Sequence, residues 1–326
     1  MKIVILDDYQ NAVRGLDCFS RLEGHDVAVH NDMAPNQDAL IARLMEAEAV
    51  VLIRERTVIH GALLERLPNL RLISQTGKIS NHIDIEACTA HGVSVAEGVG
   101  SPLAPAELCW ALIMAAERRI PQYCSELKEG RWQSARGVGI GRALRGHTLG
   151  IWGYGKIGRL VAGFGRAFGM KIVVWGRNAS LSAAAADGFE ALRDKRSLFE
   201  GSDVLSLHLR LNDTTQGCVT LEDLRAMKSD ALFVNTSRAE LVEPGALRSA
   251  LCSGRPGFAA IDVYENEPVT DPNHPLLLMD NVICTPHLGY VEQAGYELYF
   301  DKAFENVVAF AAGSPQNIAN PTAMRD

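Results

Sequence analysis

The feature that most constrains the fold of this chain is a glycine-rich turn between two short apolar runs. The first run, Leu149–Trp152, leads into Gly153, Gly155 and Gly158. Apolar residues at helical spacing follow, and a second apolar run, Lys171–Trp175, begins about twenty residues after the turn starts. A strand, a glycine turn, a helix and a second strand in this order predict a dinucleotide-binding βαβ unit.

The chemistry of a dinucleotide explains the three glycines. Gly153 allows the tight turn, Gly155 lets the backbone approach a pyrophosphate, and Gly158 lets the helix pack closely on its strand. The helix N-terminus offers N–H groups and a positive dipole end to the phosphates. A purely structural glycine turn is the alternative, but the flanking strands and helix favour dinucleotide binding. We expect contacts to the cofactor from Gly153, Tyr154, Gly155, Lys156, Ile157 and Gly158.

The end of the second strand bears on which dinucleotide binds. An NAD-preferring site places an acidic residue there for the ribose hydroxyls, whereas this chain has Gly176, Arg177 and Asn178. No carboxylate is there to repel a 2′-phosphate, and Arg177 is able to pair with one. The sequence therefore favours NADP(H), with NAD(H) as the alternative if Arg177 only stacks on adenine.

Length and composition exclude several classes of protein. At 326 residues the chain suits two domains, and a hydrophobic content of 47% can fill their cores. A net charge of −7 without a long basic run argues against nucleic acid or an anionic membrane as partner. The seven scattered cysteines indicate neither a disulfide framework nor a metal site, and we expect them to be small buried residues. The chain enters an apolar strand without a signal-peptide pattern, so we expect a cytoplasmic protein.

Residues 1–100 alternate apolar strands with helix-like segments, which predicts a parallel sheet flanked by helices. The expected strands are Lys2–Leu6, Asp26–His30, Ala49–Ile53, Leu70–Ser74 and Val93–Ala96. The expected helices lie near Asn11–Leu22, Asn36–Ala47, Gly61–Leu67 and Ile83–His91. This region has no glycine-rich phosphate turn, so it is a second α/β domain and not a second nucleotide site.

The glycine turn belongs to another sheet, which begins after a proline-marked helix, Ala106 to Arg119, and an irregular connection over Gly130–Gly146. Its further strands are expected at Val204–Leu207, Ala231–Asn235, Phe258–Val263 and Val282–Thr285, with helices such as Leu221–Met227 and Glu243–Cys252. A final amphipathic helix, Val291–Ala312, needs a partner surface, and packing back on the first domain would make that domain discontinuous. We expect a dinucleotide-binding domain at residues 101–290 and a discontinuous substrate domain at 1–100 and 291–326.

Polar residues that follow strands of the second sheet are candidates for chemistry, since ligands collect at the carboxyl ends of parallel strands. They are Arg238, Glu265, Glu267 and His287. An arginine can grip a carboxylate and polarise the carbonyl beside it, and a histidine can deliver the proton that accompanies a hydride. A nearby carboxylate would orient the imidazole. Each residue alone has a structural alternative, such as a turn for Glu267, but together they predict hydride transfer to a 2-oxo acid.

These motifs resemble those of the D-isomer-specific 2-hydroxyacid dehydrogenases, which include phosphoglycerate dehydrogenases and glyoxylate/hydroxypyruvate reductases. The resemblance covers nearly the whole chain. It rests on S-Q-T-G-K-I-S-N-H-I-D-I-E-A-C at 74–88, L-G-I-W-G-Y-G-K-I-G at 149–158, V-N-T-S-R-A-E-L-V-E at 234–243, I-D-V-Y-E-N-E-P at 261–268 and T-P-H-L-G at 285–289. It implies a Rossmann dinucleotide-binding domain, a smaller flavodoxin-like substrate domain, an active site in the cleft between them, and a homodimer.

The resemblance also implies roles for single residues. Arg238 would bind and polarise the substrate, His287 would be the acid/base, and Glu267, rather than Glu265, would be the partner of the histidine. Backbone N–H groups of the turn at 76–79 would bind the substrate carboxylate, and Asp262 would hold the nicotinamide carboxamide. The implied substrate-binding residues are Arg54, Gly77, Lys78 and Ile79. The further cofactor-binding residues are Arg177, Asn178, His208, Leu209, Thr236, Ser237, Asp262 and Gly289.

Four residues depart from the pattern of the family. Ala239 stands where glycine is usual, and Arg210 stands where proline is usual. Lys78 and Ile79 replace smaller residues in the carboxylate-binding turn. The bulk of Ile79 would narrow the pocket or reshape the turn, and the charge of Lys78 would favour a dicarboxylate or phosphorylated substrate.

The sequence thus predicts an oxidoreductase that transfers a hydride between NAD(P)H and C2 of a small 2-oxo acid or D-2-hydroxy acid. Glyoxylate, hydroxypyruvate and 3-phosphoglycerate are the substrate classes implied. The alternative is a dinucleotide-sensing scaffold similar to a transcriptional corepressor, but no peptide-binding extension supports it. An activity like that of formate dehydrogenase is disfavoured, because that branch has glutamine where this chain has Glu267.

Overall fold

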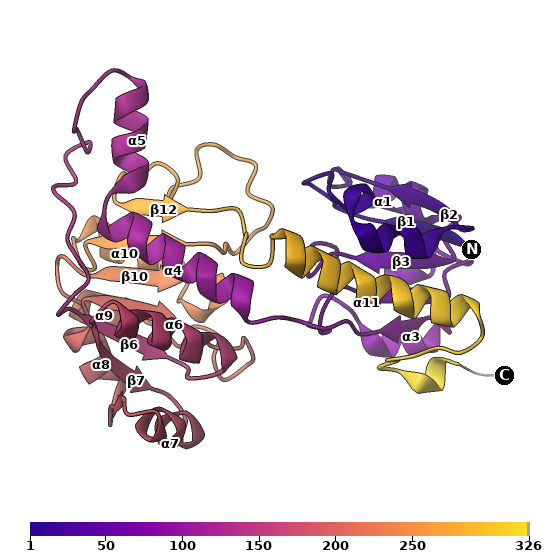
Figure 1. The fold of residues 1–326 in the computed structure, drawn as a ribbon. Coiled ribbons are helices and arrows are strands. Elements are labelled where there is room, and N and C mark those ends of the chain that lie inside the picture. Colours follow the sequence, from indigo (N-terminus) through magenta and orange to yellow (C-terminus); the bar gives the residue numbers. More distant parts are fainter. Residues whose placement is uncertain (325–326) are drawn as a thin grey trace. The chain divides into compact units, whose positions relative to one another are not determined.

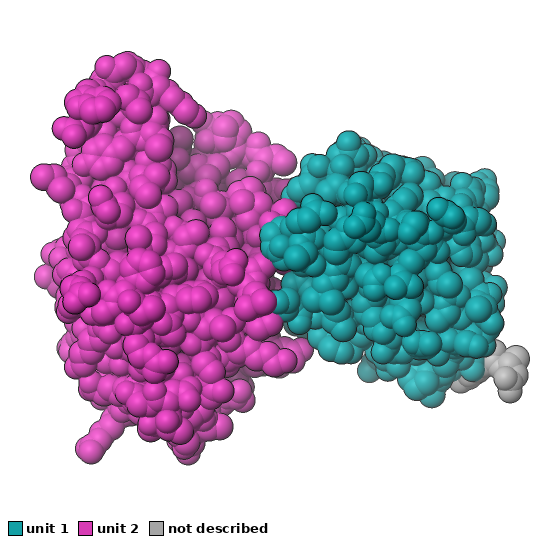
Figure 2. Space-filling model, in the orientation of Figure 1, with its two compact units in different colours: residues 1–101, 292–326 teal, residues 102–291 magenta. Residues whose placement is uncertain are grey.

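The computed structural model describes residues 1–324, which form two compact units. Unit 1 comprises Met1–Ser101 and the chain from Glu292 onward, and unit 2 comprises Pro102–Val291 (Figure 2). Each unit is built on one parallel β-sheet with helices around it (Figure 1). The expected fold class, two parallel-sheet α/β domains, is confirmed.

The sheet of unit 1 has five parallel strands in the order β2-β1-β3-β4-β5, which is the flavodoxin-like order. The strands are β1 (Lys2–Ile5), β2 (Asp26–Val29), β3 (Ala49–Leu52), β4 (Leu72–Gln75) and β5 (Ser94–Ala96). Every residue of β3, β4 and β5 is buried, because helices cover both faces of the sheet. All five expected strands are present, with ends shifted by one or two residues.

Helices pack on both faces of the sheet of unit 1. One face is packed by α1 (Gln37–Leu44), α2 (Gly61–Leu64) and α3 (Ile85–Ala90), and the other by the 3-10 helix η2 (Asp17–Leu22) and by α11 (Gln293–Ala311). Two short 3-10 helices, η1 (Val13–Gly15) and η4 (Pro321–Ala323), complete the unit. The single α-helix expected over residues 11–22 is wrong, because Leu16 adopts an extended conformation and separates η1 from η2.

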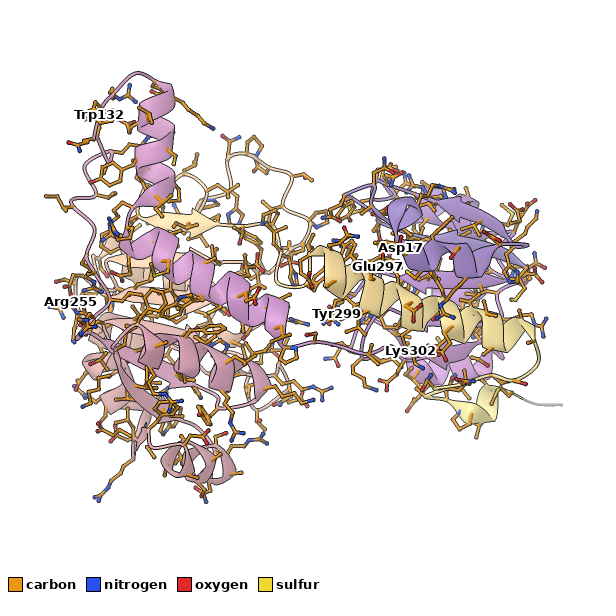
Figure 3. All side chains as sticks on the ribbon, in the orientation of Figure 1. Asp17, Trp132, Arg255, Glu297, Tyr299 and Lys302 are labelled. Carbon is orange, nitrogen blue, oxygen red and sulfur yellow. The ribbon has the colours of Figure 1, made fainter. Side chains whose placement is uncertain are left out.

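The C-terminal helix α11 is attached to unit 1 by hydrogen bonds as well as by apolar packing. The Glu297 carboxylate accepts hydrogen bonds from the N–H groups of Asp17 and Cys18, at 2.7 and 3.1 Å, where η2 begins (Figure 3). The Ser74 hydroxyl of β4 donates to the carbonyl of Ala303 at 2.8 Å. The amphipathic helix expected over residues 291–312 is therefore present, and its partner surface is the sheet of unit 1.

The sheet of unit 2 has seven parallel strands in the order β12-β11-β10-β9-β6-β7-β8. They are β6 (Thr148–Trp152), β7 (Lys171–Trp175), β8 (Glu190–Ala191), β9 (Val204–Leu207), β10 (Leu232–Asn235), β11 (Phe258–Ile261) and β12 (Val282–Cys284). The strand order reverses between β6 and β9. In a doubly wound sheet, ligands bind at the carboxyl ends of the strands at this reversal.

Both faces of the second sheet are also covered by helices. One face is packed by α4 (Leu103–Glu117), α6 (Lys156–Ala167) and α7 (Asn178–Ala186). The other face is packed by α8 (Lys195–Gly201), α9 (Leu221–Ala226) and α10 (Ala246–Cys252), and a 3-10 helix, η3 (Ala239–Leu241), follows β10. The expected proline-marked helix is α4, with Pro105 in its first turn, where a missing N–H costs little.

Three α-helices of unit 2 have no counterpart among the helices named from the sequence: α7, α8 and α5 (Ile120–Lys128). The helix α5 and the irregular chain after it project from the body of unit 2 (Figure 1). In its last turn the buried carboxylate of Glu126 pairs with the guanidinium groups of Arg131 and Arg136. Large apolar side chains are nevertheless exposed here, including Trp132 at 78% (Figure 3) and Ile140 at 90%.

The cysteines and the helices bear on two further expectations. Cys18, Cys88 and Cys109 are buried as expected, but Cys124 and Cys252 are exposed, so the expectation of buried cysteines is wrong for these two. Across residues 1–324, none of the helices combines the length and the apolar character that crossing a membrane requires.

We expect Gly158→Ala to destabilise unit 2, because the added methyl group would lie 2.2 Å from the carbonyl oxygen of Gly153. The resulting shift of α6 should lower the free energy of unfolding by about 1–3 kcal/mol. Gly163→Ala, in the same helix, is the matched control, since its Cβ would have no atom outside the helix within 4 Å. It should be neutral or stabilising by up to about 1 kcal/mol.

The four tryptophans of the chain all lie in unit 2, so urea unfolding followed by tryptophan fluorescence measures both variants. Equal free energies of unfolding for the two alanine variants would contradict the close packing of α6 on the turn.

Candidate active site

The turn after β6 forms a cradle of backbone atoms. Gly153 has a φ of 98°, which side chains rarely tolerate, and a Cβ there would lie 2.5 Å from the carbonyl oxygen of His208. Gly155 is the N-cap of α6, and no atom lies within 4 Å of the position that its Cβ would take. Backbone atoms therefore fill the space beside Gly153, whereas the space beside Gly155 is free. This arrangement fits a pyrophosphate at the N-terminus of α6.

The carboxyl end of β9 lies beside this cradle. The His208 N–H donates to the carbonyl of Trp152 at 2.8 Å, which ties the end of β9 to the end of β6. The His208 Nε2 atom lies 3.0 Å from the Ser206 hydroxyl. Burial lowers the pKa of His208 to about 4, so its ring is neutral at physiological pH. A neutral ring cannot balance the negative charge of a dinucleotide. That charge would be balanced by the N-terminus of α6 and by the basic residues after β7.

Arg177 and Asn178 follow β7 and are exposed. Arg177 is the N-cap of α7, and its carbonyl accepts hydrogen bonds from the N–H groups of Ser180 and Leu181, at 2.8 and 3.1 Å. No acidic residue occupies the first turn of α7. A guanidinium group and the N-terminus of a helix therefore lie together where the second strand of the βαβ unit ends, an environment that favours an anion.

Asn235, the last residue of β10, organises the chain that carries Arg238. Its side-chain Nδ2 donates to the carbonyl of Arg238 at 2.8 Å, and its Oδ1 accepts from the N–H of Ser237 at 3.0 Å. The Ser237 hydroxyl donates to the carbonyl of Leu207 at 2.7 Å, which fixes this segment against β9. Asn235 is only 3% exposed. Sequence reasoning did not select it, although a buried amide at a strand end was a usable signal.

The structure brings His287 and Glu267 together. The Nδ1 atom of His287 lies 2.6 Å from Oε2 of Glu267. The other carboxylate oxygen of Glu267 accepts a hydrogen bond from the N–H of Tyr264 at 2.9 Å. Glu265, the other candidate, is exposed and lines a different part of the surface. Of the two glutamates, Glu267 is the one that contacts the imidazole.

Asp262 is fully buried and anchors the loop that carries His287. Its Oδ1 accepts hydrogen bonds from the Thr285 hydroxyl and the Leu288 N–H, both at 2.7 Å, and its Oδ2 accepts from the Gly289 N–H at 2.9 Å. Burial raises the pKa of Asp262, although these hydrogen bonds act in the opposite direction. His287 itself has a φ of 52°, an uncommon conformation for a residue other than glycine. The three hydrogen bonds of Asp262 hold the loop in this conformation.

In unit 1, the expected carboxylate-binding turn follows β4. The Thr76 hydroxyl donates to the carbonyl of Leu52 at 2.8 Å and accepts from the N–H of Arg54 at 3.0 Å. A Cβ at Gly77 would lie 2.1 Å from Nη1 of Arg54, so a side chain at residue 77 would require the end of the arginine to move. The guanidinium group of Arg54 thus lies against the turn, so two of the expected substrate-binding residues are adjacent.

Lys78 and Ile79, the two residues of this turn that depart from the family pattern, both contact the carboxylate of Glu97. The ammonium group of Lys78 lies 2.6 Å from Oε2 of Glu97, and the N–H of Ile79 donates to Oε1 of Glu97 at 3.1 Å. The Ile79 side chain packs against the apolar core of unit 1. The charge of Lys78 is therefore paired with an acid that sequence reasoning did not select. Nothing in the local spacing of the residues connects the turn to Glu97.

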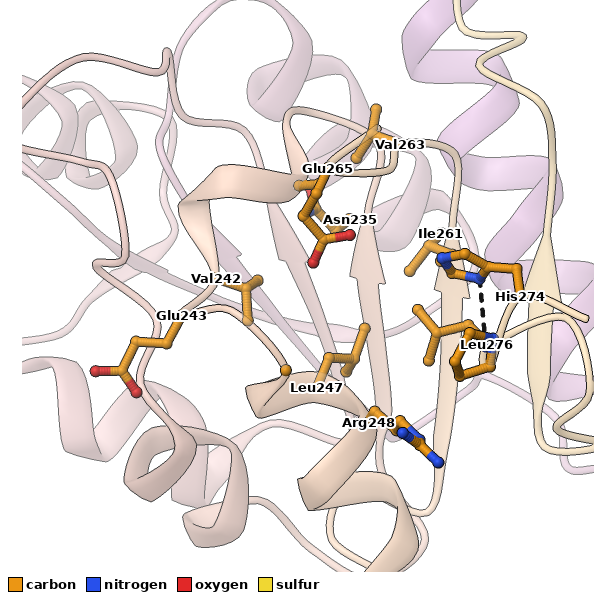
Figure 4. A pocket seen from close by; sticks show the side chains of 13 residues that line it. Asn235, Val242, Glu243, Leu247, Arg248, Ile261, Val263, Glu265, His274 and Leu276 are labelled. Carbon is orange, nitrogen blue, oxygen red and sulfur yellow. Dashed lines mark hydrogen bonds between the residues drawn. The ribbon is translucent and has the colours of Figure 1, made fainter. Parts of the chain in front are cut away.

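A pocket of about 250 Å³ lies between α10 and the chain after β11, and Asn235 at the end of β10 also lines it (Figure 4). Its lining includes Glu243, Arg248, Glu265 and His274. Neither Arg238, Glu267 nor His287 lines it. We therefore do not place the candidate chemistry in this pocket, although Asn235 and Ile261, the last residues of β10 and β11, line it.

Comparison with known proteins gives a consistent result. Residues 110–289 match a family model described as D-isomer specific 2-hydroxyacid dehydrogenase, NAD binding domain. A glyoxylate reductase from Aeropyrum pernix is 38% identical over 294 residues, which are 88% of this chain and 87% of that protein. A D-3-phosphoglycerate dehydrogenase from Methanocaldococcus jannaschii is 36% identical over 254 residues, which are 78% of this chain but only 48% of that protein.

Solved structures agree with this. The crystal structure of a phosphoglycerate oxidoreductase from Vibrio cholerae O395 is 60% identical in sequence, with a TM-score of 0.94. The match covers 96% of this chain and 99% of that chain.

We expect His208 to make the stability of unit 2 depend on pH. Burial lowers the pKa of His208 from 6.5 to about 4. Between these two pH values the His208 ring is protonated in the unfolded state and neutral in the native state. The free energy of unfolding should therefore fall as the pH is lowered from about 7 to 4, with at most about 3 kcal/mol from this group. In the variant H208Q, which keeps a polar atom near Ser206, this contribution should be lost.

Urea unfolding at several pH values, followed by tryptophan fluorescence, measures the difference. H91Q is the control, since it removes an exposed histidine from unit 1. The same pH dependence in H208Q and the unchanged protein would show that His208 is not the group responsible.

Proposed function

This chain belongs to the D-isomer specific 2-hydroxyacid dehydrogenase family, and we propose that Arg238, Glu267 and His287 carry its reaction. Members of the family are oxidoreductases, and this chain transfers a hydride between a nicotinamide dinucleotide and C2 of a 2-oxo or 2-hydroxy acid. The observation that carries the assignment of residues is the 2.6 Å contact between His287 Nδ1 and Glu267 Oε2.

His287 is the proton donor and acceptor in this proposal. With Nδ1 directed to Glu267, its Nε2 atom is the one available to exchange a proton with the substrate oxygen. The carboxylate holds the ring in one orientation and stabilises the positive charge that the ring carries while both nitrogens are protonated. Glu267 is itself held by the N–H of Tyr264, so the orientation of the ring is set by the backbone.

Arg238 binds the substrate in this proposal. A guanidinium group grips the carboxylate of a 2-oxo acid and polarises the neighbouring carbonyl, which makes C2 a better hydride acceptor. The bound dinucleotide supplies or accepts the hydride. Asn235 supports this role by fixing the backbone of Arg238, so we propose it as a positioning residue.

We propose that unit 2 is the dinucleotide-binding domain and unit 1 the substrate domain. The open backbone at Gly155 and the N-terminus of α6 support the first role, with the residues around His208, Thr236 and Asp262 lining the cofactor. The turn at 76–79 and the adjacent Arg54 support the second role, since backbone N–H groups and a guanidinium are donors for a carboxylate.

We further propose a homodimer formed through unit 2. The large apolar side chains exposed along α5 and the chain after it support this, because burying them against a second copy would remove them from water. These side chains are Ile120, Leu127, Trp132 and Ile140. The molar mass in solution tests the proposal, and a monomer at micromolar concentration would refute it.

The assignment of His287 predicts a selective loss of turnover. His287→Gln should reduce kcat by about 10²-fold or more, the usual contribution of a general acid, while the dissociation constant of the cofactor stays unchanged. Reduction of glyoxylate, hydroxypyruvate, pyruvate and phosphohydroxypyruvate, followed through the absorbance of NADH or NADPH, measures it. The control is His274→Gln, which alters a histidine that does not contact Glu267. Unchanged turnover in His287→Gln would refute the role.

The position of Arg177 leads us to propose NADP(H) as the preferred cofactor. Arg177→Ala should raise KM for NADPH by about tenfold or more, the effect of losing a charged hydrogen bond to a 2′-phosphate, and leave KM for NADH nearly unchanged. Arg196→Ala is the control, because Arg196 is an exposed arginine of α8 paired with Glu200. An unchanged protein that uses NADH as well as NADPH would show the preference to be wrong.

A further inference from the structure

Glu97 stands directly after β5 and holds the turn at residues 76–79, here called the carboxylate loop. One of its carboxylate oxygens lies 2.6 Å from the Lys78 ammonium group, and the other accepts the Ile79 N–H at 3.1 Å. A single acidic side chain thus contacts both a side chain and a backbone donor of the loop. The two residues of the loop that depart from the family pattern are the two that Glu97 contacts.

The position of Glu97 is fixed by the backbone around it. Its N–H donates to the carbonyl of Asn317 at 2.9 Å, and its carbonyl accepts from the side chain of Asn306 at 3.1 Å. The next residue, Gly98, donates to the carbonyl of Gly77 at 2.8 Å. A Cβ at Gly98 would lie 2.6 Å from the Gly77 nitrogen. The carboxylate of Glu97 is therefore presented to the loop by a rigid segment.

Glu97 also determines which donors the carboxylate loop offers to a ligand. The N–H of Thr76 is bonded to the carbonyl of Leu52, and the N–H of Ile79 is bonded to Glu97. Within residues 1–324, the N–H groups of Gly77 and Lys78 make no hydrogen bond. Two consecutive donors match the two oxygens of one carboxylate. With the N–H of Ile79 occupied, the loop offers no third backbone donor to a second anionic group.

The charges beside the loop are balanced. Lys78 is paired with Glu97, and Nε of Arg54 lies 3.7 Å from a carboxylate oxygen of the neighbouring Glu55. Each of these two cations therefore has an acidic partner within 4 Å. A phosphorylated 2-oxo acid carries about two more negative charges than an unphosphorylated one. Such a substrate gains little from a cation whose field is already cancelled by an adjacent carboxylate.

We propose that Glu97 is a specificity-determining residue, which makes the carboxylate loop select 2-oxo acids with a single negative charge over phosphorylated ones. Glyoxylate and hydroxypyruvate belong to the favoured class, and phosphohydroxypyruvate belongs to the disfavoured one. The inference rests on the proposed function of unit 1 in binding the substrate. It reverses the expectation from sequence that Lys78 favours a dicarboxylate or phosphorylated substrate.

The variant E97Q tests this, because glutamine keeps the size and an acceptor for the Ile79 N–H but removes the charge that opposes Lys78. An ammonium group about 8 Å from a phosphate in water changes its binding about fivefold. The ratio of kcat/KM for phosphohydroxypyruvate to that for hydroxypyruvate should therefore rise about fivefold in E97Q. The change should lie in KM and not in kcat, and it should shrink as the salt concentration rises.

Three further variants separate charge from structure. K78M removes the cation and should lower the same ratio, and the double variant K78M/E97Q, in which neither charge remains, should return it toward that of the unchanged protein. E46Q is the matched control. Glu46 pairs with Lys2 at the start of β1, so it lies at the amino ends of the parallel strands, whereas the carboxylate loop lies at their carboxyl ends. E46Q should therefore leave the ratio unchanged.

The possible outcomes distinguish this inference from the proposed function. An unchanged protein that turns over phosphohydroxypyruvate more efficiently than hydroxypyruvate would overturn the inference alone, as would an E97Q variant with an unaltered, salt-independent ratio. Failure to reduce any 2-oxo acid would overturn the proposed function and the inference with it. A rise in the ratio for E97Q and a fall for K78M would support it.

Discussion

The close approach of backbone to backbone at the turn between β6 and α6 is the constraint on which unit 2 depends. A Cβ at Gly158 would lie 2.2 Å from the carbonyl oxygen of Gly153, and a Cβ at Gly153 would lie 2.5 Å from that of His208. The start of α6 and the ends of β6 and β9 therefore meet with no side chain between them. The strand order reverses at this point, so a place where backbone packs closely on backbone is also where a dinucleotide has access to the backbone.

A buried carboxylate sets the position of the acid/base candidate in a comparable way. Burying a charge such as that of Asp262 is costly unless hydrogen bonds replace the water that it loses. Here the side chain of Thr285 and the N–H groups of Leu288 and Gly289 replace that water. Since these groups flank His287, the hydrogen bonds that compensate for burial also hold His287 in its left-handed conformation. The hydrogen bonds that compensate for the burial of Asp262 thus determine where the imidazole of His287 lies.

The parts of the structure that sequence reasoning found are those with a local signal. Apolar runs predicted the strands of both sheets except β8, which has only two residues, and the three glycines predicted the βαβ unit. Glu265 and Glu267 follow the same strand, so the local sequence does not show which of them is the partner of His287. Only the resemblance to a family favoured Glu267. The pairing of Lys78 with Glu97 was missed because the partners come from the ends of two different strands, β4 and β5. The helix α5 was missed as an element, although Ile120, Tyr123, Cys124 and Leu127 stand at helical spacing.

The return of the chain to unit 1 links the C-terminal helix to the carboxylate loop. Residues of α11 such as Phe300 and Phe304 are fully buried, so the core of unit 1 is incomplete until the segment after unit 2 has been made. Joining such distant segments costs little at equilibrium, since each doubling of a loop adds about 0.6 kcal/mol. Unit 2 is continuous in sequence and has no such dependence. Because Asn306 of α11 binds the backbone of Glu97, and Glu97 binds the loop, the geometry of the loop depends on α11.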